Sequence, residues 1–118
     1  MNVKDFYNLT GSDYSTALTR LMNDAFIKRF VLKFKDNNSF NDIMKAYNDK
    51  DTKLLFEATH NMKGVAGNLS LTKLFDLSSE ICEKARNERN FSALDIDNDI
   101  VKLKEAYNLI MDNIDKID

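Results

Sequence analysis

The sequence predicts an all-α fold, an antiparallel four-helix bundle with additional short helices at the N-terminal end. The chain contains no proline and only three glycines, so the turn residues that separate many short strands are missing. Apolar residues recur with the 3.6-residue period of amphipathic helices along most of its length. With 118 residues, 43% of them hydrophobic, we expect residues 1–118 to form a single domain around one core.

Three short amphipathic segments are expected in the first part of the chain. Ser12 is the predicted N-cap of the first, whose apolar positions have i, i+3, i+4 and i+7 spacing. Polar residues at 35–39 and 48–51 separate the second and third segments from their neighbours. The helical spacing of the phenylalanines predicts that they lie in the core. The apolar positions are Tyr14, Ala17, Leu18 and Leu21; Phe26, Ile27, Phe30, Val31 and Phe34; and Phe40, Ile43, Met44 and Tyr47.

Three longer helices are expected over residues 52–69, 72–89 and 94–117. Their apolar residues are spaced mainly 3 and 4 apart, which is typical of a bundle seam, and short connections favour antiparallel neighbours. Residues 94–97 alternate like a strand, but the long helical continuation outweighs that pattern. The seam residues are Leu55, Ala58, Met62, Val65 and Leu69; Leu74, Leu77, Ile81 and Ala85; and Ile96, Ile100, Leu103, Tyr107, Ile110, Ile114 and Ile117.

Charge and composition exclude several classes of function. There are 17 Lys and Arg against 19 Asp and Glu, so no broad basic surface for nucleic acid is expected. No apolar run approaches the roughly 20 residues of a membrane span, and no secretory signal is recognisable, so we expect no membrane partner and a cytoplasmic location. The single cysteine, Cys82, excludes an internal disulfide and is expected to be a small, partly buried hydrophobic residue.

The only histidine, His60, is the candidate for chemistry. On a helical wheel the seam of residues 52–69 falls about 140° to 220° away from it, so its side chain points outward. Phe56, Lys63, Gly64 and Gly67 share its side of the helix, and we call these five residues the histidine face. Two glycines inside a helix cost about 1 kcal/mol each relative to alanine, which indicates that another requirement favours them.

The glycines predict access to the imidazole. Helical side chains tilt toward the N-terminus, so a side chain at position 64 would lean over His60, and Gly67 extends the bare strip by another turn. Neutral imidazole is a good nucleophile near neutral pH, and Lys63 offers a charge to offset an added phosphoryl group. Phe56 is interpreted either as a docking contact for a partner or as a residue covered by the N-terminal helices.

Four other roles for the region around His60 follow from the types of residue present: a solvated charge pair, a metal site, a haem ligand and a nucleotide site. A helical histidine beside a lysine is often only a solvated pair. No metal site is expected, because there is no second histidine and Cys82 lies on another predicted helix. Haem ligation does not fit a histidine that faces away from the core. No glycine-rich phosphate loop is present, so no nucleotide site is expected.

The segment from His60 to Leu69, HNMKGVAGNL, resembles the signature of histidine-containing phosphotransfer (HPt) domains of multistep phosphorelays. Residues 56–59 and 71–74 resemble the flanks of that signature, and diffuse helical agreement covers about residues 24–89. Many members have leucine where Met62 stands and glycine or another small residue where Ser70 stands; neither position is the phosphoacceptor.

The resemblance implies a four-helix bundle in which His60 accepts a phosphoryl group from the aspartyl phosphate of a receiver domain and passes it to another. It further implies that Lys63 neutralises the phosphoryl group and that Gly64 and Gly67 admit the receiver. The chain would be a phosphoryl carrier rather than an enzyme, with no cofactor of its own, Mg²⁺ belonging to its partner. Its partners would be receiver domains of response regulators or a hybrid histidine kinase.

The same residues fit two alternative functions. The phosphoacceptor domain of a chemotaxis-type or hybrid sensor kinase has a similar motif. A non-catalytic helical interaction module would dock a partner through Phe56 and the glycine strip without chemistry.

Overall fold

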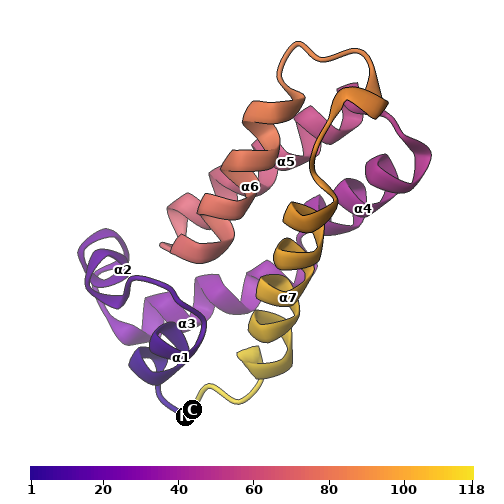
Figure 1. Ribbon diagram of the computed structural model, residues 1–118. Helices are drawn as coiled ribbons and strands as arrows, with labels where there is room; N and C mark the ends of the chain where they lie inside the picture. The colour runs from indigo at the N-terminus through magenta and orange to yellow at the C-terminus, as the bar shows by residue number, and fades with distance from the viewer.

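The computed structural model describes all 118 residues and contains helices and connections but no strands, which confirms the all-α class (Figure 1). Two 3₁₀ turns, η1 (Phe34–Asp36) and η2 (Phe91–Ala93), interrupt the α-helices. The α-helices are α1 (Val3–Leu9), α2 (Tyr14–Leu21), α3 (Asp24–Lys33), α4 (Ser39–Asp49), α5 (Thr52–Asn68), α6 (Thr72–Ala85) and α7 (Asp97–Ile114).

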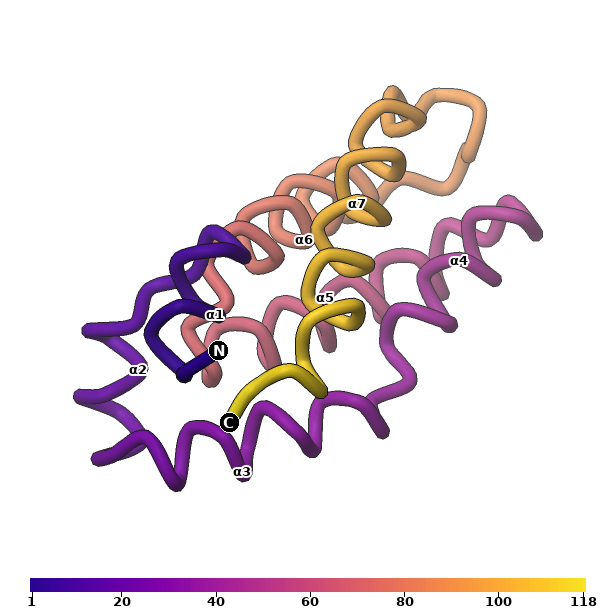
Figure 2. The backbone as a smooth tube through the Cα atoms, turned by 90° about the horizontal axis from the view of Figure 1, so that it is seen from below, coloured from indigo at the N-terminus to yellow at the C-terminus, as the bar shows by residue number.

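Helix α5 has packed neighbours on two sides. It lies along α4 and along α6, and α7 packs against α6. The short helices α1 and α2 pack with each other and with α3 at one end of the molecule, which measures 44 × 24 × 21 Å (Figure 1). Figure 2 shows α3 leading into α4 along one edge, with the two chain ends near each other. The backbone N–H of Asp118 donates to the carbonyl of Met1 at 2.7 Å.

One cluster of 25 buried apolar side chains forms the core. The predicted seam of α5 is confirmed at Leu55, Ala58, Met62 and Leu69, whereas Val65 is only half-buried. The predicted seams of α6 and α7 are confirmed in the same way, with Leu77 and Tyr107 as the half-buried exceptions. Cys82 is fully buried rather than partly so, at 1% exposed.

The predicted N-cap of α2 is wrong by one residue. Asp13 caps the helix, its Oδ1 accepting the N–H of Thr16 at 3.0 Å. The Ser12 hydroxyl is instead hydrogen-bonded to the Thr10 hydroxyl at 2.9 Å, so it is not free to cap. An ionised carboxylate also complements the positive end of the helix dipole better than a hydroxyl does.

The predicted helices 72–89 and 94–117 are both too long. Helix α6 ends at Ala85, and Asn87 adopts a left-handed backbone with φ of +58° that turns the chain away. Helix α7 begins at Asp97 and ends at Ile114. The ammonium of Lys84 binds the Asp95 carbonyl at 3.0 Å and the Asp99 carboxylate at 2.8 Å, so the segment before α7 is fixed to α6 in a non-helical form.

The prediction of a phenylalanine core is wrong for Phe26 and Phe30, which are 41% and 39% exposed. Helix α3 is covered only on the side that carries Ile27, Val31 and the following Phe34. Phe26 and Phe30 therefore lie outside that covered side, whereas Phe34 lies on it and is buried. None of the helices combines the length and the apolar content that a membrane span requires.

Candidate functional site

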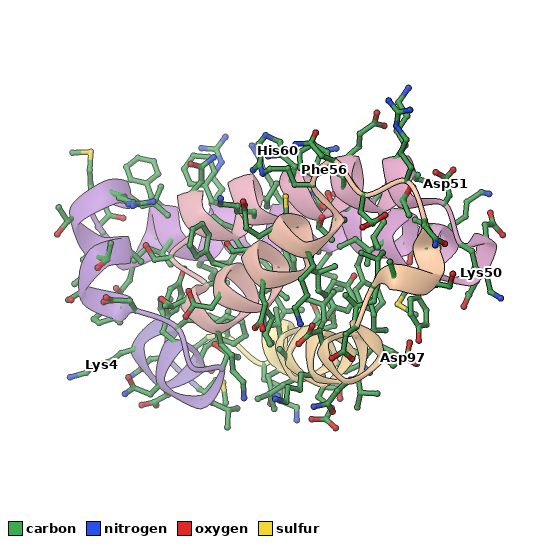
Figure 3. The ribbon with its side chains drawn as sticks, turned by 45° about the horizontal axis from the view of Figure 1, so that its top comes forward. Lys4, Lys50, Asp51, Phe56, His60 and Asp97 are labelled. Atoms are coloured by element: carbon green, nitrogen blue, oxygen red, sulfur yellow. The ribbon has the colours of Figure 1, made fainter.

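The candidate site lies on the uncovered side of α5, where His60 is exposed. The N-cap of the helix is Asp51, whose side chain accepts the N–H of Leu54 at 3.0 Å, and the opposite side of the helix is buried in the core. Figure 3 shows His60 and Phe56 projecting from the same side of the molecule. The imidazole therefore points outward, as the helical wheel predicts.

One edge of the site is aromatic. The rings of Phe56 and His60 are stacked, with centroids 6.1 Å apart and an interplanar angle of 27°. The guanidinium of Arg86, just beyond α6, lies 5.1 Å from the centroid of the Phe56 ring. Glu83 accepts hydrogen bonds from Arg86 at 3.1 and 3.2 Å and raises the pKa of that guanidinium. Phe56 is thus half-buried beneath an arginine near α6, not beneath the N-terminal helices.

The other edge carries Lys63. Its Nζ lies 5.9 Å from the centroid of the Phe75 ring on α6, a cation–π contact with the neighbouring helix. Lys63 is half-buried and makes no ion pair. Its positive charge therefore remains available to an anion.

The two glycines of the histidine face have different surroundings. A Cβ atom added at Gly64 would meet no other atom within 4 Å, so the space over that turn is open. A Cβ atom added at Gly67 would lie 3.3 Å and 3.4 Å from two carbons of the Phe75 ring. Gly64 leaves His60 uncovered, whereas Gly67 accommodates the close approach of Phe75.

A second cation reaches this surface from α2. Arg20, in the last turn of that helix, donates a hydrogen bond from its guanidinium to the carbonyl of Gly67. One open hollow connects it with the rest of the site. The lining residues of that hollow are Arg20, His60, Lys63, Gly64, Gly67, Asn68 and Phe75.

Arg20, Phe75 and Arg86 are the site residues that the sequence did not reveal. They are far from His60 along the chain, and nothing in the spacing of α2 or α6 marks them as neighbours of α5. No group of three or more His, Cys, Asp or Glu side chains is arranged to hold a metal ion. No protein-family model, curated protein or solved structure matches the chain.

Proposed function

We propose that this protein is a histidine phosphotransfer protein, which relays a phosphoryl group between aspartates of receiver domains in a two-component phosphorelay. One observation carries the proposal: the exposed imidazole of His60 shares a hollow with the unpaired ammonium of Lys63, and the turn at Gly64 is open. Phosphoryl transfer requires positioning and charge neutralisation more than covalent assistance, and these residues supply both.

The proposed reaction is an in-line displacement at phosphorus. The unprotonated ring nitrogen of neutral His60 attacks, the new N–P bond forms, and the P–O bond to the donor's aspartyl carboxyl breaks. The donor leaves as a carboxylate, and the proton on the other ring nitrogen is released to water. Lys63 offsets the two negative charges of the phosphohistidine, and the reverse step transfers the group to a second aspartate.

The proposal also covers architecture, partners and location. We assign α4, α5, α6 and α7 to the four-helix bundle of an HPt domain, with α1 and α2 as the additional N-terminal helices. Receiver domains of response regulators, or a hybrid histidine kinase, are the proposed partners. Gly64 and Phe56 are the proposed docking residues, whereas Gly67, which the sequence pattern grouped with them, is assigned to the packing of Phe75 beside the site. The chain acts as a carrier in the cytoplasm, without a nucleotide site of its own. The same chemistry would serve if the chain is the phosphoacceptor domain of a chemotaxis-type or hybrid kinase.

The test is transfer of ³²P from a panel of pre-phosphorylated receiver domains to the wild type and to His60→Gln. We expect an acid-labile, base-stable label on the wild type and none on the variant. Circular dichroism of His60→Gln is the control for folding, because an exposed side chain should be replaceable without unfolding α5.

An intact wild type that no receiver and no small phosphodonor labels would refute the proposal. A His60→Gln variant labelled as strongly as the wild type would refute the assignment of His60. In the first case the non-catalytic interaction module becomes the better account, and it predicts partner binding that tolerates His60→Gln.

A further inference from the structure

We infer that Arg20 of α2 is a second phosphate-binding cation of this site, which draws an anionic phosphodonor into the hollow and offsets charge during transfer. The inference rests on the proposed function of His60. It assigns the role to a residue 40 positions earlier in the chain, on a helix that contributes nothing to the histidine face.

The first support is placement. The guanidinium of Arg20 and the imidazole of His60 line the same open hollow, which Lys63 and Phe75 also line. Gly67, to which Arg20 is bonded, lies seven residues after His60, which is about 10 Å along the helix. That separation equals the Debye length of about 10 Å at 0.1 M salt, so the charge of Arg20 is only partly screened there and acts more strongly on an approaching anion at lower salt.

The second support is the electrostatic state of Arg20. Arg20 makes no ion pair, and its guanidinium donates to a neutral carbonyl near the C-terminal end of α5. The carboxylate that caps its helix, Asp13, accepts hydrogen bonds from Thr16 and Ser15 and forms no ion pair with Arg20. A guanidinium held only by a carbonyl can exchange that bond for a stronger, charge-assisted bond to a phosphoryl oxygen.

The third support is the contrast with Arg86 on the other side of His60. Arg86 is paired with Glu83 and lies over the Phe56 ring, so its charge is already compensated. The positive charges of Lys63 and Arg20 are not paired with a carboxylate, and both side chains line the hollow beside the two glycines. An incoming phosphodonor therefore meets two free cations on one side of the imidazole and a neutralised pair on the other.

The test uses phosphoramidate as a small donor, so that no receiver interface contributes. The imidazole nitrogen attacks phosphorus and the donor's P–N bond breaks. The leaving nitrogen takes up one proton and departs as ammonia, which balances the proton that the other ring nitrogen of His60 releases. The second-order rate constant of labelling is measured from low to high salt for wild type, Arg20→Ala, Arg20→Lys and Arg29→Ala. Arg29, an exposed arginine on α3, is the matched control for loss of one positive charge.

We expect Arg20→Ala to label about two- to fivefold more slowly at low salt, the effect of one exposed charge pair, and to depend less steeply on salt. Arg20→Lys should retain most of the rate, and Arg29→Ala should behave like the wild type. A purely structural role for the bond to Gly67 would lower the rate equally at all salt concentrations.

Four outcomes would overturn the inference. An Arg20→Ala variant with the rate and salt dependence of the wild type refutes it while leaving the proposed function intact. A loss that is independent of salt, or an equal loss in Arg29→Ala, also refutes it. A wild type that neither phosphoramidate nor any receiver labels refutes the proposed function, and the inference with it.

Discussion

The two turns of α5 that carry Gly64 and Gly67 look alike in the sequence but have different surroundings in the structure. Gly64 and Gly67 are three residues apart, and both share the side of the helix that bears His60. A side chain at 64 would enter empty space, whereas a side chain at 67 would press against the Phe75 ring. The open turn is suited to a partner, and the filled turn to packing within the molecule.

The difference teaches that a glycine inside a helix has to be judged by what faces it. Around Gly67, three helices are in contact. The Phe75 ring of α6 lies beside the glycine, and Arg20 of α2 donates to its carbonyl. The N–H of Asp13, before α2, donates to the Ser70 carbonyl at 2.9 Å. Around Gly64 no such contact exists. Substitutions at the two turns should therefore separate function from stability.

The largest effects are expected from substituting leucine for the glycine at each turn. Gly64→Leu should fold normally, yet transfer from a receiver should fall about tenfold or more, which corresponds to roughly 1.4 kcal/mol of lost docking free energy. Gly67→Leu should lower the free energy of unfolding by about 1–3 kcal/mol, because Phe75 must move to make room. Receiver-dependent ³²P transfer and urea unfolding measure the two effects.

Labelling by phosphoramidate supplies the control for Gly64→Leu. His60 stays chemically intact and a small donor needs less room than a receiver, so the rate of labelling by phosphoramidate should fall much less than the rate of receiver transfer. Normal receiver transfer by Gly64→Leu would contradict the access argument. Unfolding free energies that are equal for the two leucine variants would contradict the difference in packing.

The next effect concerns Tyr7, which ties α1 to the end of α5. Its buried hydroxyl donates to the Leu69 carbonyl at 2.6 Å, and burial raises the pKa of the phenol, so the hydroxyl remains protonated. Tyr7→Phe leaves that carbonyl without this donor and should cost about 1–3 kcal/mol of stability. Urea unfolding tests this. Tyr14→Phe is the control: the Tyr14 hydroxyl donates to the exposed Asp24 carboxylate, so its removal should lower the free energy of unfolding by less.

Substitution by alanine has a smaller effect, a gain in stability that differs between the two turns. Gly64→Ala should raise the free energy of unfolding by up to about 1 kcal/mol, since alanine is the better helix former and its methyl group meets nothing. Gly67→Ala should gain less than Gly64→Ala, because the new methyl group would lie 3.3 Å from Phe75. Thermal unfolding of both variants measures this order, and equal shifts would contradict it.

The spacing of apolar residues predicted those features of the site that depend on one helix alone. The outward direction of His60, the seam of α5 and its limits within one residue all follow from spacing within residues 52–69. The covering of Phe56 by Arg86 and the filling of Gly67 by Phe75 depend on how helices pack, which no spacing within one helix encodes. The exposed Phe26 and Phe30 show the same limit, because an apolar stripe does not specify which part of it a neighbour covers.

The smallest expected effect is a pH dependence of α2, the helix that brings Arg20 to Gly67. Hydrogen bonds from the Thr16 backbone N–H, then from the Thr16 and Ser15 side chains, lower the pKa of Asp13. Its stabilising contribution is therefore complete above the ordinary aspartate pKa of about 3.9 and is lost as the pH falls through the lower folded value.

Asp13→Asn keeps a capping side chain that does not titrate, so its stability should lack this acid-dependent part. Urea unfolding at pH 7 and at pH 3 should show a difference between wild type and Asp13→Asn that narrows at the lower pH, while exposed Asp112→Asn shows no such change. Because α2 contacts the filled turn and not the open one, acid should weaken amide-exchange protection around Gly67 before it affects Gly64. Equal loss of protection at both glycines would mean that α5 responds as a unit and that the two turns are not independent.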